Sequence, residues 1–120
     1  MAALEIAPEG THFVRAGRPF PLILDTVWAT FAEAAEDEWR HYLAVRRQQG
    51  FTGLLISILP VLHDRTEQGG REPFAFNADG RPYDFDRPDA GYFERAREYV
   101  RIATADGFVP ALGVLWSNYM

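Results

Sequence analysis

Cysteine is absent from this sequence of 120 residues, which excludes disulfides, thiol catalysis, zinc fingers and iron–sulfur clusters. The chain also lacks any run of about 20 apolar residues, so we expect a soluble protein with no contact to a membrane. Basic residues are few, because 12 Lys and Arg face 17 Asp and Glu for a net charge of -5. Nucleic-acid binding needs a clustered basic face, so we expect no nucleic-acid partner.

Other signatures are missing too. His12, His41 and His63 do not form a metal-ligand pattern, and no glycine-rich phosphate loop occurs. We therefore expect neither a metal nor a cofactor. The N-terminus shows no basic start followed by an apolar stretch, so no signal peptide is visible, and the sequence assigns no compartment.

The composition is that of a globular domain. Hydrophobic residues make up 48% of the chain and charged residues 24%, close to the averages for soluble domains. Aromatic residues reach 14% and include three tryptophans. Their large rings can fill a core, and they can also provide flat platforms for sugars.

Short apolar runs alternate with helical patterns along the chain. Each helical pattern ends at a glycine, Gly50 or Gly107, which is a typical helix stop. Such alternation predicts parallel strands joined by right-handed helical crossovers. The expected elements are a strand at 22–24 buried on both faces, a helix at 36–49, a strand at 51–59, a helix between Asp89 and Gly107, and a strand at 108–116.

Two stretches depart from this alternation. Residues 1–21 read as an N-terminal extension with a small hairpin or tight turn at Ala16-Gly17. Residues 60–88 are rich in proline, glycine and charge without a sustained period, which predicts a long functional or mobile loop. The two helix–glycine–strand units also resemble each other at an offset of 57 residues, although any two such units look alike.

Several short motifs follow one another in a characteristic order and spacing. They are Gly17-Arg18-Pro19-Phe20, Leu24-Asp25-Thr26-Val27-Trp28, Tyr42-Leu43, Gly50-Phe51-Thr52, Pro73-Phe74, Tyr92-Phe93 and a strand ending near Trp116. Together they resemble the opening of apiosidase-like glycoside hydrolases, over residues 12–118. The resemblance implies a (β/α)8 barrel that acts on glycosidic bonds.

A complete barrel of this type needs about 250 residues. We therefore expect an α/β fold that is a partial (β/α)8 TIM barrel, with about three parallel strands and two connecting helices. In this interpretation residues 22–120 are the N-terminal portion of a truncated catalytic domain. A flavodoxin-like or other open α/β domain is an alternative, and sequence beyond residue 120 would separate the two.

Active sites of such barrels lie at the carboxyl ends of the strands, which selects the candidate substrate-binding residues. They are Asp25, Thr26, Trp28, His63, Trp116 and Asn118. Asp25 could instead cap the next helix, the tryptophans could be core residues, His63 could be a solvated loop residue, and Asn118 could belong to a disordered tail. Trp39 lies on a helical stripe and is expected in the core.

No catalytic residue is assigned within this chain. Glycoside hydrolysis needs two carboxyl groups that flank one bond, and Asp25 has no partner at a strand end, since Glu67 and Glu72 lie in the loop. The family's catalytic carboxylates should lie on later strands.

The sequence thus predicts a fragment of a glycoside hydrolase that hydrolyses O-glycosidic bonds in a poly- or oligosaccharide. It would supply part of the substrate-binding rim and be inactive alone. The alternative is a small, non-enzymatic α/β module that binds carbohydrate or a protein partner. Exposed strand edges would favour self-association.

Overall fold

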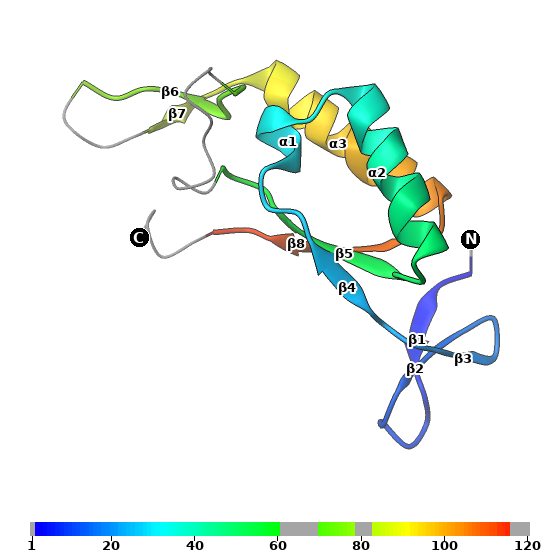
Figure 1. Ribbon diagram of the computed structural model, residues 1–120. Helices are drawn as coiled ribbons and strands as arrows, with labels where there is room; N and C mark the ends of the chain where they lie inside the picture. The colour runs from blue at the N-terminus through cyan, green and yellow to red at the C-terminus, as the bar shows by residue number, and fades with distance from the viewer. Residues whose placement is uncertain (1, 61–69, 79–82, 116–120) are drawn as a thin grey trace.

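The computed structural model describes residues 2–60, 70–78 and 83–115. Its centre is a parallel sheet with the strand order β4-β5-β8. Three helices lie over one face of this sheet (Figure 1). The strands are β4 (Leu24–Thr26), β5 (Gly53–Ser57) and β8 (Val109–Gly113), and the helices are α1 (Thr30–Glu33), α2 (Glu36–Gln48) and α3 (Ala90–Ala105). Helices alternate with parallel strands, so the predicted α/β fold class is confirmed.

Both long helices begin and end at the expected places. Asp89 caps α3, because its carboxylate accepts a hydrogen bond of 2.7 Å from the backbone N–H of Tyr92. Gly50 after α2 and Gly107 after α3 have φ values of 88° and 96°, which favour glycine. The paired hydrogen bonds that define a Schellman turn close both helices, from Gly50 and Phe51 to carbonyls of α2 and from the equivalent residues to α3.

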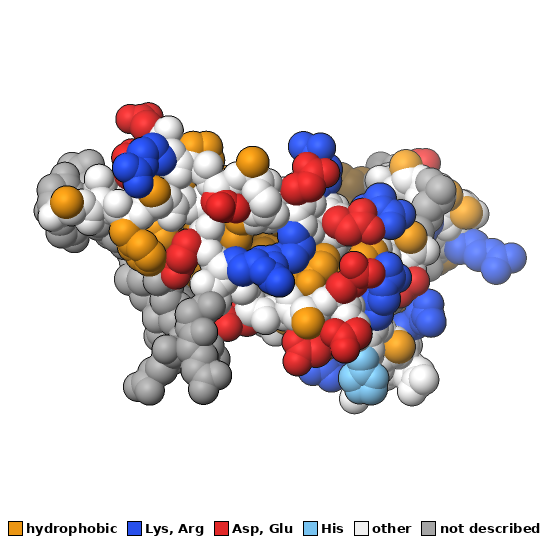
Figure 2. Space-filling model, turned by 90° about the horizontal axis from the view of Figure 1, so that it is seen from above, with side chains coloured by type: hydrophobic (Ala, Val, Ile, Leu, Met, Phe, Trp, Pro, Cys, Tyr) orange, Lys and Arg blue, Asp and Glu red, His pale blue; other side chains and the backbone are white. Residues whose placement is uncertain are grey.

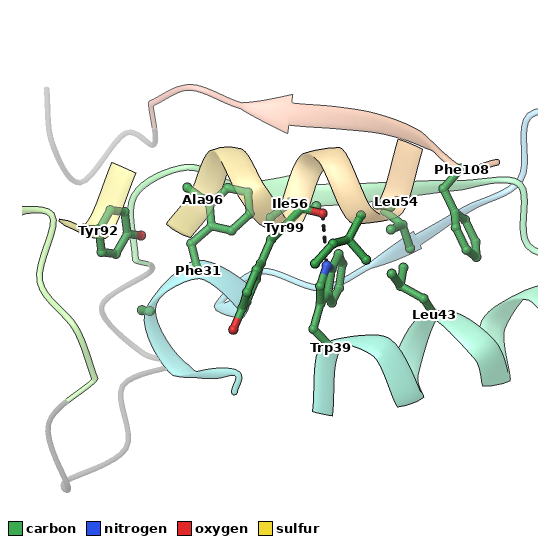
Figure 3. Close-up of a cluster of buried hydrophobic side chains, with 12 residues drawn as sticks. Phe31, Trp39, Leu43, Leu54, Ile56, Tyr92, Ala96, Tyr99 and Phe108 are labelled. Atoms are coloured by element: carbon green, nitrogen blue, oxygen red, sulfur yellow. Dashed lines mark hydrogen bonds between the residues drawn. The ribbon is translucent and has the colours of Figure 1, made fainter. Parts of the chain in front are cut away.

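The core lies between the helices and the sheet (Figure 3). Trp39 of α2 is buried there as predicted, and its indole N–H donates to the backbone carbonyl of Tyr99 over 3.0 Å. The same two rings are stacked with centroids 5.9 Å apart. This pair joins α2 to α3 and satisfies the polar atom that burying a tryptophan would otherwise leave unpaired.

The first parallel strand differs from its prediction in two ways. It spans Leu24–Thr26 rather than residues 22–24, and Ile23 and Leu24 are 51% and 38% exposed. The prediction of a strand buried on both faces is therefore wrong. Among the described residues β4 is an edge strand, and the helices cover only one face of its sheet.

The long loop predicted at 60–88 contains a two-stranded antiparallel sheet. Its strands are β6 (Phe74–Ala75) and β7 (Asp84–Pro88), and their pairing has an irregular register. The backbone N–H of Asp89 donates to the carbonyl of Pro73 over 2.8 Å, which ties this hairpin to the start of α3. The prediction of a loop is thus wrong for β6 and β7, and a functional role of this segment stays a prediction.

The N-terminal segment forms a separate antiparallel sheet of β1 (Leu4–Ile6), β2 (Phe13–Arg15) and β3 (Arg18–Phe20). Ala16 and Gly17 make the turn between the last two strands, both with positive φ. Arg15 connects this sheet to the rest of the chain, since its guanidinium donates to the carbonyl of Gly107 over 2.9 Å. In the described parts of the chain, no helix has both the length and the hydropathy that crossing a membrane requires.

Candidate functional site

The carboxyl ends of β4, β5 and β8 point to one end of the molecule (Figure 1). The short helix α1 and the β6–β7 hairpin lie at this same end, because each is part of a connection from a strand to the following long helix. In parallel α/β folds the residues that follow the strands at this end build the ligand site. The predicted substrate-binding residues that follow β4 should therefore lie at this end.

Asp25 does not face open solvent at this end. In the sheet it is in register with Leu54, which is buried under the helices, so its side chain points towards α2. One carboxylate oxygen accepts a hydrogen bond of 2.6 Å from the hydroxyl of Tyr42 and pairs with the guanidinium of Arg46. The other oxygen accepts from the backbone N–H of Thr26 over 3.0 Å. We call Asp25, Tyr42 and Arg46 the β4–α2 cluster.

The charges of this cluster are fixed by its geometry. Partial burial acts to raise the pKa of Asp25, but the hydrogen bonds from Tyr42 and Arg46 and the charge of the guanidinium outweigh it and lower the pKa. For Tyr42, burial and the hydrogen bond to the carboxylate raise the pKa to about 12. Tyr42 is therefore a neutral donor and Asp25 an ionised acceptor near neutral pH.

This arrangement gives Asp25 a structural role that the sequence did not predict. It does not cap α1, whose N-cap residue Ala29 makes no capping hydrogen bond through its side chain. Sugar contact by Asp25 stays a prediction, and it would compete with the two donors from α2. The signal that sequence reasoning missed is the spacing of Tyr42 and Arg46, which places both side chains on one face of α2.

Thr26 and Trp28, unlike Asp25, lie where a substrate-binding residue at the end of β4 is expected. Thr26 alternates with Asp25 along β4, so it points to the sheet face away from the helices, where it is exposed. Trp28 follows the strand and is half-buried. The hydroxyl of Ser57, at the end of β5, donates to the carbonyl of Leu59 and is buried. Thr26 and Trp28 therefore remain candidates for substrate contact.

His63, Trp116 and Asn118 lie outside the described residues, and so does Glu67. The three predicted contacts stay predictions from sequence. Within the described ranges, no three His, Asp or Glu side chains gather as they would around a metal ion.

The helix layer has a different chemistry from the strand ends. Acidic and basic side chains lie interspersed over it, without a large area of one sign (Figure 2). A shallow groove of about 620 Å³ runs between α2 and α3, with Arg71, Arg95 and Glu98 in its wall. Arg95 donates to the backbone carbonyl of Phe31 over 2.6 Å, so this arginine links α3 to α1.

Two solved structures share this fold. One is described as "Glycoside hydrolase" and superposes with a TM-score of 0.70 at 18% identity, over 98% of this chain and 26% of its own. The other, a glycoside hydrolase family 5 protein from Bacteroides vulgatus ATCC 8482, gives a TM-score of 0.67 at 17% identity, over 97% of this chain and 25% of its own. The described fold is part of a (β/α)8 barrel, as predicted, and the chain spans about a quarter of the length of these proteins.

Residues 8–120 match the family described as "Apiosidase-like, catalytic domain". The match covers nearly the whole chain, so this chain belongs to the apiosidase-like family of glycoside hydrolases. The resemblance inferred from the motifs is confirmed. No curated protein matches the sequence closely enough to count as a relative.

Proposed function

We propose that this chain supplies the first three strands and part of the substrate-binding rim of a glycoside hydrolase that cleaves O-glycosidic bonds in a poly- or oligosaccharide. The observation that carries this proposal is the parallel β4-β5-β8 sheet of an apiosidase-like chain, with an exposed Thr26 and a half-buried Trp28 where its first strand ends. A hydroxyl can bond to sugar hydroxyls, and an indole ring can pack on the apolar face of a sugar.

We further propose that these three strands alone do not hydrolyse a glycoside. Hydrolysis requires two carboxyl groups on either side of the scissile bond. Of the candidates Asp25, Glu67 and Glu72, the last two belong to the loop and Glu67 lies outside the described residues. Asp25 and Glu72 are engaged within the protein, since Asp25 bonds to Tyr42 and Arg46, and Glu72 accepts from the hydroxyl of Tyr83. The catalytic pair would then come from later strands of the barrel.

Release of reducing ends from a panel of soluble polysaccharides tests this function. We expect turnover by the protein that carries this chain together with the remaining barrel strands, and none by residues 1–120 alone. Trp28→Ala should raise KM, whereas Phe13→Ala in the N-terminal sheet is the matched control and should not. Turnover by residues 1–120 alone would refute the division of roles. Sugar binding without turnover by either protein would favour the non-enzymatic module.

Self-association is a further part of the proposal for residues 1–120. Among the described strands β4 and β8 are both edges, and Leu112, Val114 and Leu115 near the β8 edge are exposed. Unpaired edges and exposed apolar side chains promote pairing between chains. Light scattering after size-exclusion chromatography should detect dimers or larger species of residues 1–120, and a monomer at high concentration would exclude this association.

A further inference from the structure

The β6–β7 hairpin contains a group of packed aromatic rings, which we call the hairpin cluster: Phe74, Phe76, Tyr83 and Phe85. Tyr83 is buried at its centre, with the ring of Phe76 stacked on it at a centroid distance of 5.7 Å and Phe85 at 6.5 Å. Phe74 packs edge-on against Phe85 at 5.1 Å. Although both contact buried rings, Phe76 and Phe85 are 57% and 49% exposed. The cluster thus presents two phenyl rings to solvent, and both of them contact Tyr83.

The half-buried Phe74 and the buried Tyr83 hold these two rings in place. Phe74 packs against Phe93 of α3 at 5.6 Å. The hydroxyl of Tyr83 donates to Glu72, and its backbone carbonyl accepts from the amide of Asn77 over 3.0 Å. A ring that is already fixed loses little conformational freedom when a ligand packs on it, which favours binding.

The position of the hairpin points to the ligand. It belongs to the connection between β5 and α3, and it lies at the end of the molecule where the parallel strands end (Figure 1). Hydrophobic side chains reach the surface at this end also in the view from above (Figure 2). In a barrel hydrolase this end faces the substrate. A polysaccharide that occupies the site would therefore pass close to the exposed rings.

Polar groups on the same hairpin suit a sugar better than an apolar ligand. Asp86, next to Phe85, is exposed, and Asp84 forms an ion pair with Arg87 with a distance of 3.5 Å. Carboxylates accept hydrogen bonds from hydroxyls, and a guanidinium donates them. A sugar ring has one apolar face of C–H groups and a rim of hydroxyls, so it matches a hairpin that exposes both phenyl rings and charged side chains.

We propose that Phe76 and Phe85 form a stacking platform for a sugar unit of a polymeric substrate, outside the bond that is cleaved. This inference rests on the proposed glycoside hydrolase function and deepens it. The two rings add affinity for a long substrate, and a short substrate that fills only the catalytic centre does not reach them.

The test compares a soluble polysaccharide with a short chromogenic glycoside in the protein that contains the whole barrel. Covering a half-exposed phenyl face contributes a few-fold in affinity, so Phe76→Ala with Phe85→Ala should raise KM for the polysaccharide about tenfold. We expect kcat to stay similar and the short glycoside to react as before. Phe76→Tyr with Phe85→Tyr keeps both rings and should keep the original KM. Phe13→Ala removes a 36% exposed phenyl ring from the N-terminal sheet and serves as the matched control.

The outcomes separate this inference from the function on which it rests. Turnover of the polysaccharide with an unchanged KM in the double alanine variant would overturn the platform and leave the hydrolase function intact. A drop in melting temperature with unchanged KM would show that the rings pack against another part of the protein, which also overturns it. If the protein turns over no glycoside, the function fails. Calorimetric titration with the polysaccharide then tests the platform separately. The platform requires that the original protein binds the polysaccharide and that the double alanine variant does not.

Discussion

Replacing Tyr42 by phenylalanine tests the cluster that joins β4 to α2. Only the hydroxyl is removed, and with it the hydrogen bond of 2.6 Å to Asp25. The phenyl ring can keep the stacking of Tyr42 on Trp39, where the centroids are 5.5 Å apart, and its place 4.9 Å below the guanidinium of Arg46. The substitution therefore isolates one hydrogen bond to a charged acceptor.

The expected loss follows from the environment of that bond. A hydrogen bond to a charged group contributes about 1.5–3 kcal/mol. The side chain of Asp25 is 23% exposed, and water can partly replace the lost donor, so we expect the lower end of the range. Urea unfolding of Tyr42→Phe at pH 7 should therefore show a free energy of unfolding lower by about 1.5 kcal/mol. In a double-mutant cycle with Asp25→Asn, most of this loss should appear as coupling between the two residues.

The pH dependence gives a second, independent check. Because the pKa of Asp25 is lowered in the folded state, its stabilisation is present above the unfolded pKa and is lost as pH falls through the folded one. The difference between Tyr42→Phe and the original protein should therefore shrink in acid. The raised pKa of Tyr42 acts at alkaline pH. The stabilisation that Tyr42 contributes is complete below pH 10.0 and is lost as pH rises to about 12. The variant should lack this alkaline loss.

The reasoning would be refuted if the free energy of unfolding fell by less than about 0.3 kcal/mol at pH 7, because even independent sites deviate from additivity by that amount. A loss that stays constant down to acid pH would refute it equally, since the bond depends on an ionised carboxylate.

Three further substitutions test the packing of the α/β unit. Trp39→Ala removes the buried ring and the hydrogen bond to Tyr99, and we expect a loss of about 3–5 kcal/mol in urea unfolding. Gly53→Ala should cost about 1–3 kcal/mol in the same assay, because the new methyl group would lie 2.9 Å from the carbonyl of Val109; an unchanged midpoint would mean that the strands separate easily. Asp89→Ala removes the cap of α3 and should cost about 1 kcal/mol, whereas Asp89→Asn should keep most of it.

Local signals in the sequence were sufficient to predict the alternation of helices and parallel strands. The apolar stripe of α3, its cap at Asp89 and the glycine stops each lie within one continuous stretch of sequence, so they can be read without knowing the rest of the fold. The β6–β7 hairpin was missed because its strands are short and their register is irregular around Phe74 and Ala75, which hides the alternation typical of strands.

The site was predictable in its place but not in its contacts. Parallel topology alone puts Asp25, Thr26 and Trp28 near one end of the sheet. The face to which Asp25 points depends on the register between β4 and β5, and a shift of one residue would turn it away from α2. Register is set by contacts between segments far apart in the chain, so the bond to Tyr42 could not be read from the sequence around Asp25.

The two Schellman turns have a consequence for the order of folding. Gly50 and Gly107 lie 57 residues apart and end their helices with the same pair of hydrogen bonds. Each turn is built from about six consecutive residues, so it can close as soon as that stretch leaves the ribosome. In the parallel sheet, β5 and β8 each follow such a turn, so each strand can fold back antiparallel to the helix before it as soon as the turn has formed. The sheet can then grow from β4 to β5 to β8 in the order of synthesis.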